Sequence, residues 1–195
     1  MGKFQFQRKH ILPLVLLVIC LALATQLFRQ ANQIYMMKES IQRDMEYQAD
    51  YLVHACVDLS GNLDTDKEMM THFISQLQSR LNYFHHHTYL YRQFSDVPGY
   101  DYSEAYQIMT ILGKCCVVVD SYDDFAEEEQ EIFLNFLAEL SDQIRLAFSY
   151  SYRYESENLN EEFTYIMNGW KQLDQYMKEN NIWDYCVANI DPLDD

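Results

Sequence analysis

Histidine side chains are the first candidates for metal chemistry in this chain. Three of them, His85, His86 and His87, are consecutive. On a helix, successive residues point about 100° apart, so these three rings cannot converge on one ion. An alternative would join His54 and His72 to nearby cysteines, since nitrogen and sulfur ligands suit zinc. No C-x-x-C or H-E-x-x-H pattern supports that site. We therefore predict no metal ion and no cofactor.

Catalytic patterns are also missing from the sequence. There is no G-x-S-x-G, no P-loop and no G-x-G-x-x-G, and five glycines leave little material for a phosphate-binding loop. The acidic stretches DSYDD and AEEEQE contain many carboxylates. Carboxylates at a helix start are stabilised by the helix dipole and need no catalytic role. We predict that the protein is not an enzyme.

A hydrophobic segment decides where the rest of the chain lies. Residues 11–28, ILPLVLLVICLALATQLF, are uncharged and would extend about 27 Å as a helix, enough to cross a membrane. Ala22 and Ala24 resemble a signal-peptidase site, so the alternative is a secreted chain cut after Ala24. We favour a retained signal-anchor because the apolar helical spacing continues without Gly or Pro to Leu59. The basic residues 1–10 then form a cytoplasmic tail, and the C-terminal part lies outside.

Four further helices follow from apolar residues spaced by threes and fours. Their expected start signals are Thr65 with Glu68, Asp101 with Glu104, Asp124 with Glu127, and Asn158 with Glu161. We predict an all-α fold in which a transmembrane helix continues into an extracytoplasmic up-and-down bundle of about five helices, residues 29–181. Residues 182–195 form an acidic tail, some of whose apolar residues fold back onto the bundle. The residues expected to face the core are Ile41, Met45, Ala49, Leu52, Cys56 and Leu59; Met70, Phe73, Leu77, Leu81 and Phe84; Ala105, Ile108, Leu112, Cys116 and Val119; Ile132, Phe136, Leu140, Ile144 and Phe148; and Phe163, Ile166, Trp170, Leu173 and Met177.

This helix order places the cysteines of the outer domain at the end farthest from the membrane. Thiols that lie close together outside the cytoplasm tend to oxidise. We predict a disulfide among Cys56, Cys116 and Cys186, with Cys116 preferred over Cys115 because it lies on the core stripe. The alternative is that these cysteines are reduced, buried and inert.

The same order places tyrosines at the end nearest the membrane. A tyrosine ring is apolar with a polar tip, which suits lipid headgroups or a protein contact. The alternatives are that these rings simply close the core or that they line a small-ligand pocket. The predicted contact consists of Tyr89, Tyr91, Arg92, Tyr150, Tyr152 and Arg153.

Charge narrows the range of partners. Residues 1–29 carry four bases and no acid, whereas the remainder holds ten bases and thirty acids, a net charge of −20. Such a domain repels phosphate backbones, so nucleic acid is excluded. We predict a non-enzymatic, membrane-anchored interaction module, an accessory, scaffold or regulatory subunit of an envelope complex, with a protein partner that is basic or membrane-embedded. The alternative is an acidic inhibitor or immunity-type protein that neutralises a basic exported partner.

Overall fold

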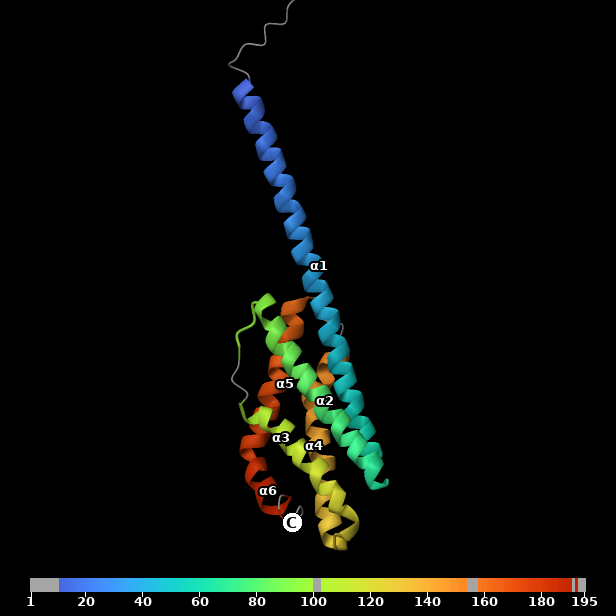
Figure 1. Ribbon diagram of the computed structural model, residues 1–195. Coiled ribbons are helices and arrows are strands. Elements are labelled where there is room, and N and C mark those ends of the chain that lie inside the picture. The colour runs from blue at the N-terminus through green and yellow to red at the C-terminus, as the bar shows by residue number, and fades with distance from the viewer. Residues whose placement is uncertain (1–10, 100–102, 154–157, 191, 193–195) are drawn as a thin grey trace, which may run out of the picture. The chain divides into compact units, whose positions relative to one another are not determined.

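The computed structural model describes residues 11–99, 103–153, 158–190 and 192, with the side chains of 11, 12 and 150–153 left out (Figure 1). Over these residues the chain forms six α-helices, two 3₁₀ helices and no strand, so the predicted all-α class is confirmed. The elements are α1 (Ile11–Gly61), α2 (Lys67–Tyr91), η2 (Arg92–Phe94), α3 (Ser103–Val118), η3 (Val119–Asp124), α4 (Glu127–Arg153), α5 (Leu159–Glu179) and α6 (Ile182–Asn189).

Helix α1 contributes to two compact units, one ending at Ser40 and the other beginning at Ile41. In the first unit, α1 holds an 18-residue window of mean hydropathy 1.9, none of which is buried. The Thr25 hydroxyl donates to the carbonyls of Leu21 and Ala22, both at 2.8 Å, so its polar group is satisfied within the helix. The helix is apolar and long enough to cross a membrane, a property that membrane anchors and signal sequences share.

In the second unit, α2 runs antiparallel to the second half of α1 (Figure 1). The His87 Nδ1 lies 3.0 Å from the Asp44 carboxylate, and the Arg80 guanidinium lies 5.0 Å from the centre of the Tyr51 ring. From the first contact to the second, the residue number falls on α2 and rises on α1. The two helices therefore run in opposite directions. The backbone is helical at every residue from Ile11 to Gly61, so the expectation of an uninterrupted first helix is confirmed.

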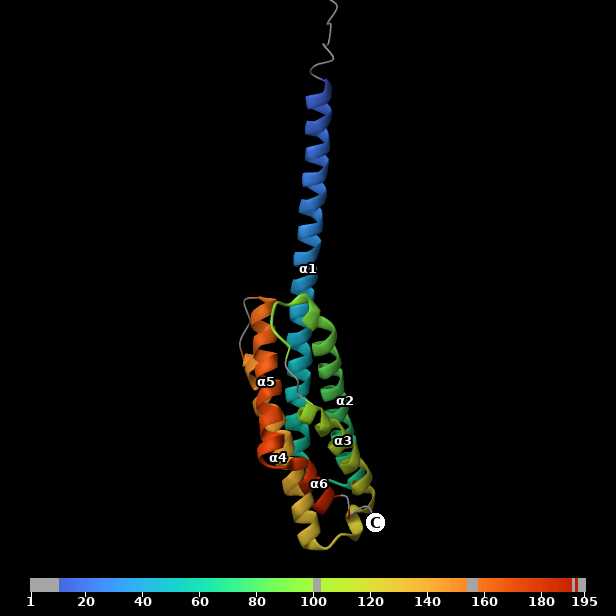
Figure 2. The ribbon, with the colours of Figure 1, turned by 90° about the vertical axis from the view of Figure 1, so that its left-hand side faces the viewer.

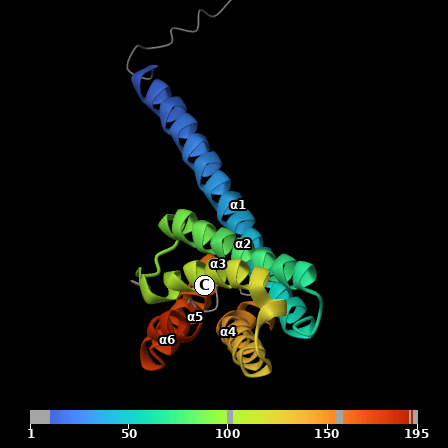
Figure 3. The ribbon, with the colours of Figure 1, turned by 60° about the horizontal axis from the view of Figure 1, so that its bottom comes forward.

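The remaining helices also alternate in direction. Cys116 near the end of α3 contacts Ser75 near the start of α2, so α3 runs antiparallel to α2. The Tyr176 hydroxyl near the end of α5 donates to Glu139 on α4 at 3.1 Å, and α4 and α5 lie side by side with opposite directions (Figures 2 and 3). Short connections between long helices produce this order.

Three aromatic rings fill the centre of the second unit. Phe84 of α2, Phe148 of α4 and Trp170 of α5 are all fully buried, with ring centroids 4.9, 5.0 and 6.0 Å apart in pairs. Next to them, α5 approaches α4 so closely that a Cβ at Gly169 would lie 2.5 Å from the Ala147 carbonyl oxygen. Glycine is required there because no side chain fits between the two backbones.

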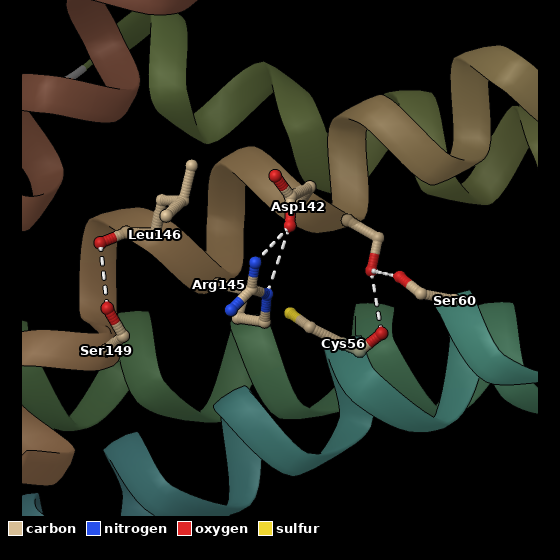
Figure 4. Close-up of polar contacts among 7 residues, drawn as sticks. Cys56, Ser60, Asp142, Arg145, Leu146 and Ser149 are labelled. Carbon is tan, nitrogen blue, oxygen red and sulfur yellow. Dashed lines mark hydrogen bonds and ion pairs between the residues drawn. The ribbon is translucent and has the colours of Figure 1, made fainter.

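Polar groups also join the helices inside the core. The buried Ser141 hydroxyl of α4 donates to the Cys56 carbonyl of α1 at 2.9 Å and accepts from the Ser60 hydroxyl at 3.1 Å. Figure 4 shows the α1 residues of this contact beside the Arg145–Asp142 ion pair of α4. A buried hydroxyl with both partners satisfied fixes the register of α4 against α1 without an unpaired group.

The helix starts follow the expected signals in part. Asn158 caps α5 as predicted, because its side chain accepts from the backbone N–H groups of Asn160 and Glu161. The prediction that Thr65 caps α2 is wrong, because the N-cap is Asp66, whose side chain accepts a hydrogen bond from the Met69 N–H. Both side chains can cap a helix, so sequence alone does not choose between neighbours.

The start of α4 departs from the expected signal too, since Glu129 accepts from the Ala126 N–H where Asp124 was expected to cap. The Asp101 start of α3 lies outside the described residues.

Most of the residues expected to face the core are buried, with Phe73 and Ile132 half-buried. On α3, however, Cys115 is the fully buried thiol and Cys116 is half-exposed, so the inward placement of Cys116 is wrong. The stripe continues from Leu112 by a step of three, where a step of four was expected, and a 3.6-residue period allows either. The segment predicted as a tail forms α6, with Ile182 and Cys186 buried.

Candidate interaction surface

Two adjoining hollows lie along the seam between α1 and α2 on the outer side of the second unit. One, of about 700 Å³, is lined by Gln48, His72, Ser75, Gln76, Ser79, Arg80 and Tyr83. The other, of about 280 Å³, is lined by Asp50, Tyr51, His54, Ala55, Asp58, Gln76 and Arg80. Because Gln76 and Arg80 line both, we call the two hollows together the α1–α2 groove. The antiparallel pairing of α1 and α2 builds this groove, since neither helix alone supplies both walls.

Arg80 lies between the two hollows and lines both of them. Its guanidinium lies over the Tyr51 ring, and within the described part of the chain it forms no ion pair or hydrogen bond. Arginine has five N–H donors in a fixed planar fork that matches a carboxylate. A stacked guanidinium with unused donors is therefore a pre-positioned site for an acceptor group.

The α1 wall of the groove carries acidic and imidazole groups. Asp50 binds the neighbouring His54, whose Nδ1 lies 3.1 Å from the carboxylate. Asp58 is exposed, and over the described residues no lysine, arginine or histidine pairs with it. The groove thus has one unused positive group and one unused negative group on its walls.

Exposed tyrosines lie along the groove and beside it. Tyr51 and Tyr83 are 48% and 57% exposed, and Tyr47, one turn before Tyr51 on α1, is 61% exposed. Tyrosine and arginine are enriched at the energetic centres of protein interfaces, because they contribute large contact area with a polar handle. The side chains of this groove resemble those of a protein-binding surface more than those of an apolar ligand pocket.

The cysteines of the second unit are all thiols in the structure, and no disulfide joins Cys56, Cys116 or Cys186. Cys56 and Cys186 are fully buried. The Cys116 sulfur lies 3.4 Å from the Ser75 hydroxyl at the edge of α2. Burial raises the pKa of the Cys56 thiol to about 12 and also raises the pKa of Cys116. The disulfide therefore stays a prediction for the oxidised protein.

The three consecutive histidines contact different parts of the bundle. His85 lies against the Trp170 and Tyr106 rings, with centroid distances of 5.7 and 5.0 Å, whereas His86 is exposed. His87 pairs with Asp44 of α1. Burial, and secondarily His86, lowers the pKa of His85. Within the described residues, no three His, Cys, Asp or Glu side chains are grouped so that they could bind a metal ion.

The predicted tyrosine contact is described only in part. Tyr89 is exposed, and Tyr91 is half-buried, with its ring against His87 and its hydroxyl near Asp44. Burial, followed by Asp44, raises the pKa of Tyr91. Arg92 begins η2 and lies over the Gly99 backbone. The side chains of Tyr150, Tyr152 and Arg153 lie outside the described residues, so a shared contact surface stays a prediction.

The opposite end of the second unit, where α1 ends, is strongly acidic. Residues 57–68 and 119–131 contain eleven acids and one base, Lys67. Lys67 pairs with Asp123 of η3 at 3.2 Å, which joins the two segments. We call this region the acidic end.

Burial, then Asp64 and Asp123, raises the pKa of Tyr122 at the acidic end. Three glutamates, 127–129, occupy the first turn of α4, where the helix dipole favours them.

The α1–α2 groove has no signature in the amino-acid sequence. Its residues lie on two helices and carry no motif, and the pairing of Arg80 with Tyr51 joins positions 29 residues apart. The available signal was an arginine in an acidic domain with tyrosines at helical spacing. Comparison of the chain with protein-family models, with curated proteins and with solved structures finds no match in any of the three.

Proposed function

We propose that this protein is a single-pass, membrane-anchored interaction module, an accessory, scaffold or regulatory subunit of an envelope complex without catalytic activity of its own. Residues 11–28 serve as the anchor, residues 1–10 lie in the cytoplasm and the helical bundle lies outside. The observation that carries this proposal is the uncovered apolar window of α1 on a helix whose second half supplies core residues of the bundle.

The cost of exposing apolar side chains to water supports a membrane location for residues 11–28. Ten large apolar side chains between Leu14 and Phe28 are exposed. Leaving them in water is costly, at about 25 cal/mol per Å² of apolar surface, so lipid or another protein must cover them. The surface of the bundle offers a groove with exposed tyrosines and an arginine whose hydrogen-bond donors are unused. Anchoring plus a protein-binding face is the combination that an accessory subunit requires.

Alkaline carbonate extraction of native membranes, together with the mass of the mature chain, tests the anchor. The expected result is a full-length protein that stays in the membrane pellet. Release into the supernatant of a chain whose mass matches a start at Thr25 would instead show a secreted protein cleaved after Ala24. Crosslinking in intact membranes tests the interaction role, and monomer alone under all crosslinkers would contradict it.

The acidic end favours a second candidate, an inhibitor or immunity-type protein for a basic exported partner. Eleven carboxylates and one lysine at one end of the bundle create a negative potential that accelerates encounter with a cationic surface. Such binding weakens steeply as salt rises, because exposed charges more than about 10 Å apart are screened at 0.1 M ionic strength. Co-purification at low and high salt separates the two candidates, because close contacts in the groove weaken much less with salt than attraction by the long-range field of eleven carboxylates.

A further inference from the structure

We infer that the α1–α2 groove is the docking surface of the partner, and that the partner presents one carboxylate to Arg80 and one basic side chain to Asp58. This inference rests on the proposed interaction role and adds the site and the chemistry of the partner. Its basis is the pair of unused charges in the groove and the tyrosines around them.

The carboxylate follows from the state of Arg80. The domain outside the first 29 residues has thirty acids and ten bases, yet within the described residues Arg80 pairs with none of those acids. Stacking on Tyr51 holds its guanidinium in place, so little side-chain entropy is lost when a ligand binds. A carboxylate can accept two parallel hydrogen bonds from this fork.

The basic group follows from Asp58. Asp58 lies seven residues beyond Tyr51 on α1, and together with Arg80 it lines the smaller hollow of the groove. A partner therefore needs an acid and a base that can enter this hollow together, the acid toward Arg80 and the base toward Asp58.

A purely acidic partner fits less well, because the net charge of −20 repels it. A purely basic partner leaves Arg80 unpaired within the interface, which costs desolvation without gain. Tyr51 and Tyr83 on either side supply apolar contact around the charges.

A photo-crosslinking amino acid at Gln76, which lines both hollows, tests the inference in the full-length protein in its native membrane. The matched control carries the same amino acid at Gln172, an exposed glutamine of α5. We expect one discrete adduct at Gln76, absent from Gln172, that maps to a partner peptide containing both an acid and a base. Arg80→Glu should lower its yield by about tenfold or more, the effect of removing an interface hot spot.

Charge reversal supplies the decisive step. Replacing the mapped partner carboxylate by lysine should restore the adduct with Arg80→Glu, whereas Lys171→Glu, a surface charge reversal on α5, should leave the wild-type adduct unchanged. An adduct insensitive to Arg80→Glu, a lipid or sugar adduct, or a peptide from a second copy of this chain would overturn the inference. Adducts at Gln172 but not at Gln76 would overturn the groove and leave the interaction role standing, whereas no protein adduct at either position or with general crosslinkers would overturn both.

Discussion

Cys116 and Cys56 differ in burial, and burial controls how fast a cysteine thiol reacts. Cys116 of α3 is half-exposed beside Ser75 of α2, whereas Cys56 is fully buried in α1 with a pKa of about 12. Because the thiolate is the reactive form, both burial and the raised pKa protect Cys56. Cys115, the neighbour of Cys116, is buried too. Two cysteines that are adjacent in the sequence therefore differ in their exposure to solvent.

We predict that a disulfide reagent such as Ellman's modifies Cys116 first in the folded, reduced protein. In a Cys20→Ser background, one thiol should react rapidly and the other three at least about tenfold more slowly, at the rate of opening of the core. Cys116→Ser should abolish the fast phase, and Cys115→Ser should leave it intact. Fast modification that survives Cys116→Ser would contradict this assignment.

His85 should make the fold sensitive to acid. Burial lowers its pKa, so the folded state disfavours the charged ring relative to the unfolded chain, whose histidine pKa is about 6.5. Its contribution to stability is complete above the unfolded pKa and is lost as pH falls through that value toward the folded pKa. Urea unfolding between pH 8 and 5 should show a smaller loss of stability in His85→Gln than in wild type. His72→Gln, at an exposed histidine more than three turns before His85 on α2, is the control and should keep the wild-type slope.

At the scale of elements, the contact between α4 and α5 depends on one missing side chain. Gly169→Ala places a Cβ against the Ala147 carbonyl oxygen and the Phe148 ring, so we expect a loss of about 1–3 kcal/mol in the free energy of unfolding. Gly61→Ala, where no atom lies within 4 Å of the new Cβ, should be neutral or slightly stabilising. Equal effects in the two variants, measured by denaturant unfolding, would show that the helices do not approach as described.

The N-terminus of helix α3 is capped by a side chain from α5, which is distant in the sequence. The buried Asp174 carboxylate of α5 accepts from the backbone N–H groups of Glu104 and Ala105 at 3.1 and 3.4 Å, and it pairs with Lys178 at 2.7 Å. Asp174→Ala removes this cap and leaves buried donors unsatisfied, so we expect a loss of about 1–3 kcal/mol. Asp184→Ala on the surface of α6 should cost less than about 0.5 kcal/mol by the same unfolding measurement.

At the scale of the whole molecule, like charges repel one another. The net charge of −20 outside the first 29 residues, with eleven acids and one base at the acidic end, destabilises the compact state. Salt screens this repulsion. We predict that the melting temperature in a neutral detergent rises by about a few degrees between 20 and 300 mM NaCl. An uncharged sugar at equal osmolality is the control, and a melting temperature that falls with salt would show that ion pairs dominate instead.

The amino-acid sequence alone is enough to predict the helical class, the apolar N-terminal segment and most residues that face the core. These features depend on the hydrophobic period of 3.6 residues, which is a local property of the chain. The Asn158 cap was identifiable for the same reason, since a cap involves residues two or three positions apart.

Packing between helices selects among local alternatives that the sequence leaves equivalent. Cys115 faces the core in preference to Cys116, Asp174 caps a helix 70 residues away, and Ser141 joins α4 to α1 across 85 residues. The α1–α2 groove belongs to the same class, because Arg80 meets Tyr51 only after two helices have paired. The physical reason is that packing selects partners by distance in space, and a periodic pattern contains no information about which helices will be neighbours.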